Sequence, residues 1–141
     1  MNDLERIRYT LRNNDLFQQI PEKDLDVLTE HSTFQTVDKG QVLFVQGESA
    51  SRFFVIIYGW VKLFRETLDG TQAIVDILSS GHMFGESSLF HEDTYPYSAE
   101  AAENVEILSL PLPFLKTQLD TNPKFALAML SEMAQARRQQ D

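Results

Sequence analysis

Three histidines and many carboxylates are the side chains in this sequence with the widest chemistry. His31, His82 and His91 supply imidazoles, which bind metals and haem iron. The sequence has no cysteine, so disulfides, thiolate zinc sites, cysteine-bound iron–sulfur clusters and cysteine nucleophiles are excluded. For each histidine the alternative to metal ligation is a surface or capping role. The three histidines are therefore candidate ligands, and no metal site is predicted from their spacing.

The spacings that mark common active sites do not occur in the sequence. A cupin metalloenzyme would need a His-x-His pair, and none is present. There is no Gly-x-Ser-x-Gly elbow and no glycine-rich loop that ends in Lys-Ser or Lys-Thr. Glu92 and Asp93, which follow His91, are interpreted as part of a solvated loop. We therefore expect no enzymatic activity.

The charge balance is strongly negative. The sequence has 12 Lys and Arg residues against 21 Asp and Glu residues, a net charge of −9. Nucleic acid repels a domain this acidic, so the chain itself is not expected to bind DNA. No apolar stretch approaches the length of a membrane span, and residues 1–14 carry charges throughout, unlike a signal peptide. A cytoplasmic protein without membrane contact is predicted.

Residues 33–112 show the pattern of a β domain. Short runs rich in Val, Ile, Phe and Leu alternate with turn residues, and no helix-length periodic segment interrupts them. The six glycines fall between these runs or at their ends, and Asp69-Gly70 is the clearest hairpin signal. About eight short antiparallel strands in one domain favour a jelly roll or a closed barrel. The expected strands are Thr33–Val37, Gln41–Gln46, Phe53–Tyr58, Trp60–Glu66, Gln72–Leu78 and Val105–Leu110, with shorter pieces near Phe84 and at Ser98–Ala101.

Helices are predicted on both sides of the β domain, in residues 1–32 and 113–141. A short first helix begins at Asn2 or Asp3 and ends at Asn13-Asn14. A second helix begins at Pro21, whose ring suits a first helical turn, and ends near His31. The last helix is capped by Asn122 and has no stop signal up to the final residue, so we expect it to continue in a longer protein.

The order of elements and turns resembles the sensor domain of the Crp/Fnr family of transcription regulators. The motifs that carry the resemblance are Asp38-Lys39-Gly40, Gln46-Gly47-Glu48, Gly59 and the segment from Gly81 to Glu86, followed by a long helix. The resemblance covers residues 15–138. It implies a mainly β protein with flanking α-helices, that is, a double-stranded β-helix (jelly roll) of the cyclic-nucleotide-binding type with a C-terminal dimerisation helix.

The resemblance also implies a ligand site at Gly85, Glu86 and Ser87. In the family this segment starts a short helix whose backbone N–H groups donate hydrogen bonds to a cyclic phosphate, because a helix start offers unpaired donors and partial positive charge. The family's Glu at the position of Glu86 accepts a hydrogen bond from the ribose. The alternative is structural: Gly85 permits a turn and Glu86 caps the first helical turn.

Tyr97 marks the clearest departure from the family pattern. Cyclic-nucleotide binders of the family have an Arg before a Ser-Ala or Thr-Ala pair, and here Tyr97 precedes Ser98 and Ala99. A charged hydrogen bond to phosphate contributes about 1.5 to 3 kcal/mol, so cyclic nucleotide binding is expected to be weak or absent. Arg52 and Arg137 are candidate replacements for that charge. The expected ligand-binding residues are Gly85, Glu86, Ser87, Tyr97 and Ser98, with pocket walls from Val75, Ile77 and Leu89.

Family members without this Arg sense other signals, including gases through haem. The resemblance therefore leaves haem open as a cofactor, with His31, His82 and His91 as candidate ligands, and it does not identify the effector. The expected function is effector sensing that reaches DNA through a helix-turn-helix domain absent from this chain.

The resemblance implies a homodimer, with a seam on the last helix at Ala126, Met129, Leu130 and Met133. The alternatives are a cyclic-nucleotide-binding regulatory module of another class of protein and a haem-based gas sensor of the same family.

Overall fold

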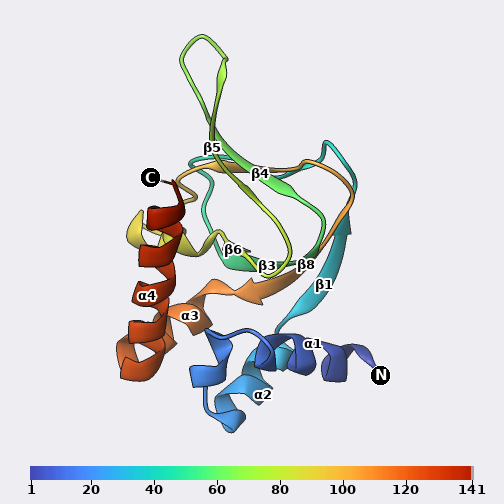
Figure 1. Ribbon diagram of the computed structural model, residues 1–141, viewed down its shortest axis with the longest axis vertical. Helices are drawn as coiled ribbons and strands as arrows, with labels where there is room; N and C mark the ends of the chain where they lie inside the picture. Colours follow the sequence, from blue (N-terminus) through green and yellow to red (C-terminus); the bar gives the residue numbers. More distant parts are fainter. Residues whose placement is uncertain (141) are drawn as a thin grey trace. The chain divides into compact units, whose positions relative to one another are not determined.

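The chain forms two compact units (Figure 1). The computed structural model describes residues 1–140, with side chains up to residue 135. A β unit takes residues 32–112, and a helical unit takes residues 1–31 together with the residues from 113 onward. The candidate ligand site predicted from the sequence lies in the β unit.

The β unit is a sandwich of two four-stranded antiparallel sheets, with strand orders β1-β8-β3-β6 and β2-β7-β4-β5. The predicted fold class is thereby confirmed. In Figure 1 the β4–β5 hairpin extends beyond the rest of this unit. The strands are β1 (Thr33–Val37), β2 (Val42–Phe44), β3 (Arg52–Tyr58), β4 (Val61–Glu66), β5 (Gln72–Leu78), β6 (Met83–Phe84), β7 (Ser98–Ala101) and β8 (Val105–Pro111).

Strand β2 is shorter than the predicted range Gln41–Gln46. The backbone N–H of Gln46 donates to the side chain of Ser98 on β7 at 2.9 Å instead of to a backbone carbonyl of that strand. Gly47 follows with a φ of +90°, which turns the chain away from the sheet. The Gln-Gly-Glu motif therefore acts as a turn that ends the strand early.

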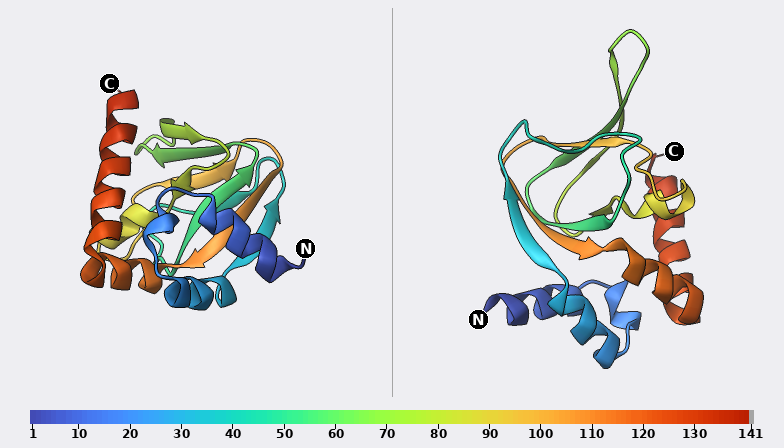
Figure 2. Two further views of the ribbon diagram at one scale, coloured as in Figure 1. Left: turned by 60° about the horizontal axis from the view of Figure 1, so that its bottom comes forward. Right: turned by 180° about the vertical axis from the view of Figure 1, so that it is seen from behind.

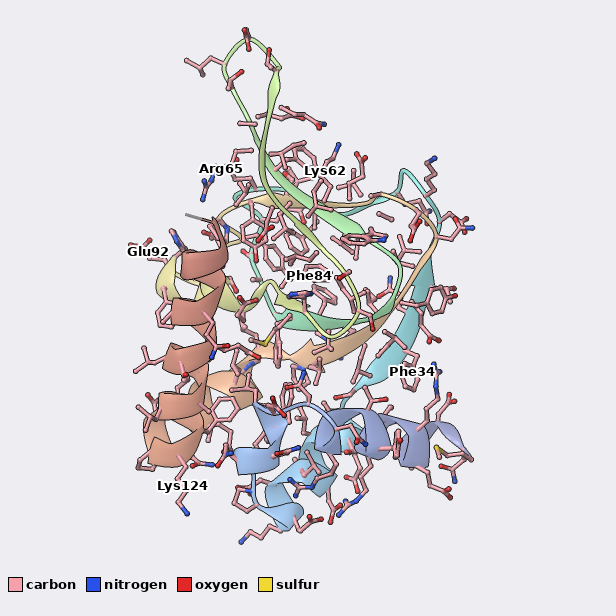
Figure 3. All side chains as sticks on the ribbon, viewed as in Figure 1. Phe34, Lys62, Arg65, Phe84, Glu92 and Lys124 are labelled. Carbon is pink, nitrogen blue, oxygen red and sulfur yellow. The ribbon has the colours of Figure 1, made fainter. Side chains whose placement is uncertain are left out.

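The core of the β unit lies between the two sheets and is unusually aromatic. Side chains that alternate along the strands face inward, as the pleat of a strand requires. Phe84 lies in this interior in Figure 3. The fully or almost fully buried core side chains are Val37, Phe44, Phe54, Ile56, Val61, Leu63, Phe84, Tyr95, Tyr97, Ala99, Ala101, Val105 and Ile107.

The helical unit confirms the predicted first, second and last helices (Figure 2). Asn2 Oδ1 accepts the Glu5 N–H at 2.8 Å, and Asn122 Oδ1 accepts the Phe125 N–H at 3.1 Å. Both predicted caps are therefore formed. The helices are α1 (Asp3–Arg12), the short 3-10 helix η1 (Phe17–Gln19), α2 (Glu22–Glu30), α3 (Leu112–Thr121) and α4 (Pro123–Gln140).

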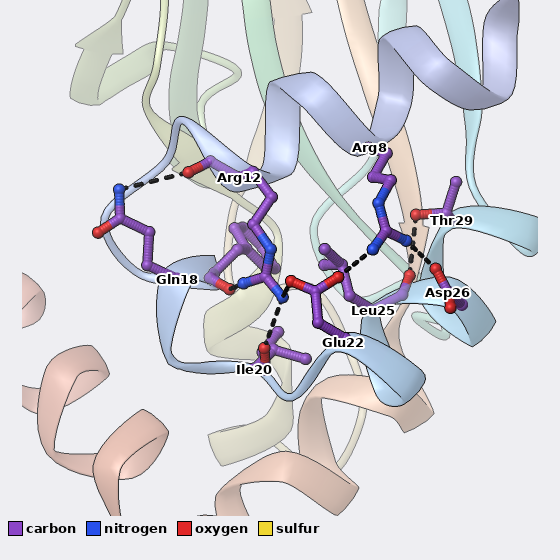
Figure 4. A network of polar contacts seen from close by, with 9 residues as sticks. Arg8, Arg12, Gln18, Ile20, Glu22, Leu25, Asp26 and Thr29 are labelled. Carbon is purple, nitrogen blue, oxygen red and sulfur yellow. Dashed lines mark hydrogen bonds and ion pairs between the residues drawn. The ribbon is translucent and has the colours of Figure 1, made fainter.

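Arg12 ties α1 to the segment that leads into α2 (Figure 4). Its guanidinium donates to the carbonyl oxygens of Phe17 at 3.2 Å and Ile20 at 3.0 Å, and to Glu22 Oε1 at 2.6 Å. Arg8 also pairs with Glu22, and with Asp26. Arg12 thus satisfies backbone acceptors, whereas Arg8 contacts carboxylates that are themselves exposed.

Gly59, between β3 and β4, is required on two grounds. Its φ is +94°, in the left-handed region that L side chains rarely adopt. A Cβ atom there would lie 2.6 Å from both the Asn104 carbonyl oxygen and Val105 Cγ1. Gly70, in the β4–β5 hairpin, has a similar φ of +84° but open space around it.

This pair of glycines separates backbone strain from steric conflict. Gly70→Ala is expected to lower the free energy of unfolding by about 1 to 2 kcal/mol, the cost of the left-handed conformation. Gly59→Ala is expected to cost a further 1 to 3 kcal/mol, roughly the range for overpacking, because Asn104 and Val105 must move. Urea denaturation of both variants measures the difference, and equal losses would contradict the contact.

The two arginines provide a second comparison. Arg12→Met is expected to destabilise the chain by about 1 to 2 kcal/mol, since two backbone carbonyls lose a charged donor. Arg8→Met is expected to cost less than about 1 kcal/mol, because exposed ion pairs contribute little. Thermal melting at low and high salt checks this. Added salt is expected to reduce the destabilisation caused by Arg8→Met and to leave most of the destabilisation caused by Arg12→Met.

Candidate functional site

The candidate site is built on the turn that follows β6. Gly85 adopts a φ of +87° and precedes the 3-10 helix η2 (Glu86–Phe90). A Cβ atom at Gly85 would lie 3.4 Å from the rings of Phe54 and Tyr95, so the backbone passes close to the core rings. The short helix that the resemblance implied is therefore present, and the residue that precedes it needs to be glycine for its conformation.

Tyr97 reaches this turn from the segment before β7. Its hydroxyl oxygen accepts the backbone N–H of Gly85 at 2.8 Å. The side chain is only 7% exposed, and burial, followed by the nearby Glu86 carboxylate, raises the pKa of the phenol. Tyr97 is therefore neutral at physiological pH, and its oxygen is the acceptor for the Gly85 N–H of the turn.

Four rings lie around the phenol of Tyr97, and together with it they form what we call the aromatic cluster. Phe44 stacks on Tyr95 with ring centroids 3.7 Å apart and lies 5.9 Å from the Tyr97 ring. Phe54 stacks on Phe84 at 5.1 Å. The Tyr95 hydroxyl donates to the Arg52 carbonyl oxygen at 2.9 Å, and burial raises the pKa of Tyr95 as well. The aromatic cluster consists of Phe44, Phe54, Phe84, Tyr95 and Tyr97.

The serines of the turn differ in their hydrogen bonds. Ser88 is fully buried and donates to the Gly85 carbonyl oxygen at 2.6 Å, which closes the turn. The Oγ atom of Ser87 is buried without a hydrogen-bond partner of ordinary geometry. Its hydroxyl nevertheless lies near enough to Tyr97 to oppose the rise in the pKa of the phenol. Ser87 is thus the polar group of this site that the fold does not fully use.

Ser98 does not join this group. Tyr97 and Ala99 both face the core, and side chains alternate along a strand, so Ser98 faces the other way. Its Oγ accepts the Gln46 N–H at 2.9 Å. The structure therefore brings together Gly85, Glu86, Ser87 and Tyr97, and it places Ser98 on the opposite face of the strand.

The expected pocket walls need one correction. Val75 packs partly buried against the core and Leu89 is half-buried, but Ile77 is 50% exposed. The pairing of β4 with β5 shifts register between Leu63 and Phe64, and Ile77 pairs with Lys62. This bulge puts Val75 and Ile77 on different faces, although they lie two residues apart.

Arg52 does not supply the missing charge to the turn. Its Nε donates to Ser109 Oγ at 3.0 Å, and its Nη2 donates to the Ser109 carbonyl oxygen at 2.8 Å. Burial is the main cause that lowers the pKa of the guanidinium. Arg137, the other candidate, lies outside the described side chains.

The three histidines lie at exposed turns and helix ends. His31 follows α2, with Nδ1 2.9 Å from the Val27 carbonyl oxygen. His82 Nδ1 is 3.0 Å from the Ser79 carbonyl oxygen, and His91 follows η2. None of them belongs to the buried aromatic cluster, so none of the three histidines is placed to ligate haem at this site. Within the described part of the chain, no group of three or more His, Asp or Glu side chains could hold a metal ion.

Helix α4 presents a different apolar stripe from the one expected. Met129 is 1% exposed and is therefore buried within the chain, while Leu127 is 69% and Leu130 is 64% exposed. Phe125 is also buried, with its ring 6.4 Å from that of Phe17. The exposed stripe thus contains Leu127 and Leu130, with Met133 partly exposed beside them. The sequence pattern missed Leu127 because residues 125–130 are all apolar, so their periodicity does not mark one face of the helix.

The helical unit also has two open clefts, of about 490 and 440 Å³. Both are bordered by Asp24, Gln118 and Thr121. The amides there bond within the fold, since Asn122 donates to Gln118 Oε1 at 3.0 Å and to the Gln19 carbonyl oxygen at 2.9 Å. We therefore assign no ligand to these clefts. None of the helices in the described residues is both long and apolar enough to cross a membrane.

The chain is similar in sequence to known regulators. The family model described as the cyclic nucleotide-binding domain matches residues 34–122. The cyclic AMP receptor protein of Thermus thermophilus is 29% identical over 100 residues, which cover 71% of this chain and 46% of that protein. A CRP-like cAMP-activated global transcriptional regulator of Mycobacterium tuberculosis is 29% identical over 84% of this chain and 53% of its own length. The chain thus spans about half the length of these curated relatives.

The fold is similar to solved structures of the same class. The sensor domain of the transcriptional regulator DNR from Pseudomonas aeruginosa has a TM-score of 0.84 at 27% identity, over 99% of this chain and 94% of that one. The catabolite activator protein of Thermus thermophilus has a TM-score of 0.69 at 27% identity, over 89% of this chain and 59% of that one. These relatives are regulators or sensor domains. The chain therefore belongs to the cyclic nucleotide-binding domain family, and it is a sensor domain of the CRP/FNR type of transcription regulator.

Proposed function

We propose that this chain senses a small effector other than a cyclic nucleotide, at the turn formed by Gly85, Glu86 and Ser87. The observation that carries the proposal is the hydrogen bond from the Gly85 N–H to the Tyr97 hydroxyl oxygen. The turn that the family uses to hold a cyclic phosphate is built here, but a phenol replaces the Arg that the resemblance implies. The neutral Tyr97 hydroxyl therefore accepts the Gly85 N–H, which a bound phosphate would need as a donor.

The signal is proposed to pass through α4 to a DNA-binding helix-turn-helix domain outside this chain. Binding free energy shifts an equilibrium only when the ligand prefers one of two arrangements, so the site and α4 must be coupled. With a net charge of −9, the chain itself does not attract DNA. The whole protein is proposed to be a cytoplasmic homodimer without enzymatic activity.

Calorimetric titration tests the ligand part of this proposal. Cyclic AMP and cyclic GMP are expected to bind the unchanged chain with dissociation constants no tighter than about 100 µM. Tyr97→Arg is expected to tighten cyclic AMP binding about ten-fold or more, the fold-change that corresponds to about 1.5 kcal/mol from a charged hydrogen bond.

The matched control is Tyr97→Phe, which removes the hydroxyl but adds no charge. It is expected to leave cyclic nucleotide binding weak. Binding of cyclic AMP by the unchanged chain at micromolar concentration or below would contradict the proposal. Equal weak binding by Tyr97→Arg and Tyr97→Phe would show that position 97 does not set the preference.

The proposed dimer is expected to use the exposed leucines of α4. Leu127 and Leu130 are three residues apart, so they lie side by side on one face of the helix. A Leu127→Glu, Leu130→Glu double variant is expected to be monomeric under conditions where the unchanged chain shows a concentration-dependent dimer in sedimentation equilibrium. Gln135→Glu is the control for added negative charge and is expected to dimerise like the unchanged chain. A monomer at millimolar concentration before any substitution would contradict the dimer.

A further inference from the structure

We propose that the effector of this site is a neutral, largely aromatic molecule with one hydrogen-bonding group, and that Tyr97 and Glu86 set this preference. The effector would take the place of the Tyr97 side chain. The inference rests on the proposed function, since it names the class of ligand for that same site.

The Tyr97 side chain is the first indication of the ligand class, because it already behaves as a ligand attached to the chain. Its ring lies in the aromatic cluster and its oxygen accepts the Gly85 N–H at 2.8 Å. A tethered group of this kind competes with free molecules at an effective concentration of order millimolar or higher. An effector must therefore replace both the ring contacts and the hydrogen bond.

The walls of the site favour an apolar, planar molecule. Phe44, Phe54 and Phe84 offer ring faces and edges, and Phe44 lies 5.9 Å from the Tyr97 ring. Aromatic rings pack well in offset or tilted arrangements, whereas burying an uncompensated charge is costly. The guanidinium of Arg52 donates to the Oγ atom and the carbonyl oxygen of Ser109, so these two donors are engaged away from Gly85.

Glu86 adds an electrostatic barrier to anions. Its carboxylate disfavours the phenolate form of Tyr97, which is an anion at this very position. The same Coulombic repulsion acts on the carboxylate or phosphate of any ligand placed there. A neutral ligand avoids this repulsion and keeps the Gly85 hydrogen bond.

Ser87 indicates where the polar group of the effector would lie. Its Oγ atom is buried and has no hydrogen-bond partner of ordinary geometry. A buried hydroxyl in this state has unused donor and acceptor capacity. An effector hydroxyl or carbonyl beside the Gly85 N–H would use that capacity, with its apolar body directed toward Phe44 and Phe84.

The experiment opens the site and compares probes of one shape but different charge. Tyr97→Ala removes the tethered phenol, and phenol and benzoate serve as the neutral and anionic probes. Calorimetry is expected to show phenol binding to Tyr97→Ala at least ten-fold more tightly than to the unchanged chain. Benzoate is expected to bind Tyr97→Ala at least ten-fold more weakly than phenol.

Glu86→Gln in the Tyr97→Ala background tests the electrostatic part. The ratio of benzoate to phenol dissociation constants is expected to fall at least three-fold, because the amide carries no charge. Tyr97→Phe is the control that keeps the ring in place, and it is expected to bind phenol as weakly as the unchanged chain does.

The outcomes separate this inference from the proposed function. If Tyr97→Ala is unfolded in buffer, phenol is expected to restore a cooperative thermal transition and benzoate is not. Benzoate binding as tight as that of phenol, or the same phenol affinity with and without Tyr97, overturns the inference. Failure of phenol to restore folding overturns it as well. None of these results changes whether the unchanged chain binds cyclic AMP, which is the separate test of the proposed function.

Discussion

The 2.8 Å hydrogen bond between the Gly85 N–H and the Tyr97 hydroxyl is the contact on which the interior of the β unit depends. It joins the turn after β6, in one sheet, to the segment that enters β7, in the other. The Tyr95 hydroxyl makes a second bond of this kind to the Arg52 carbonyl on β3. Two neighbouring phenols therefore connect the two sheets through backbone groups that would be costly to bury unpaired.

This arrangement also satisfies the turn of the family fold from within the chain. A backbone donor at the start of η2 requires an acceptor whether or not a phosphate is present. Tyr97 provides that acceptor from within the chain, and its ring fills space beside Phe44 at the same time. The glycine, the short helix and the sheet order can therefore stay unchanged.

The features predicted correctly from the sequence depend mainly on local interactions. The caps at Asn2 and Asn122 are made within three residues of the capping side chain, so residue type and spacing reveal them. The turn at Gly85 was likewise marked by its motif and by the need for a positive φ. The strands were visible in their apolar runs, which turn residues bound on both sides.

The features that the sequence did not give depend on tertiary packing. No pattern shows that the β4–β5 pairing contains a bulge, and that bulge moves Ile77 to the exposed face. Burial of Met129 and exposure of Leu127 depend on how α4 is covered, which helical periodicity alone does not specify. The contact between Tyr97 and Gly85 joins residues twelve positions apart in sequence, and only the folded chain brings them together.

The aromatic cluster has a consequence for the lifetime of the protein. Its rings are part of the hydrophobic core, so whatever occupies the Tyr97 position also contributes to the stability of the β unit. Anything that binds only the folded state lowers the population of unfolded chains, which is the form that proteases degrade. Under the proposed function, the abundance of the sensor would then depend on its effector, which would act both on the proposed DNA-binding partner domain and on protein turnover.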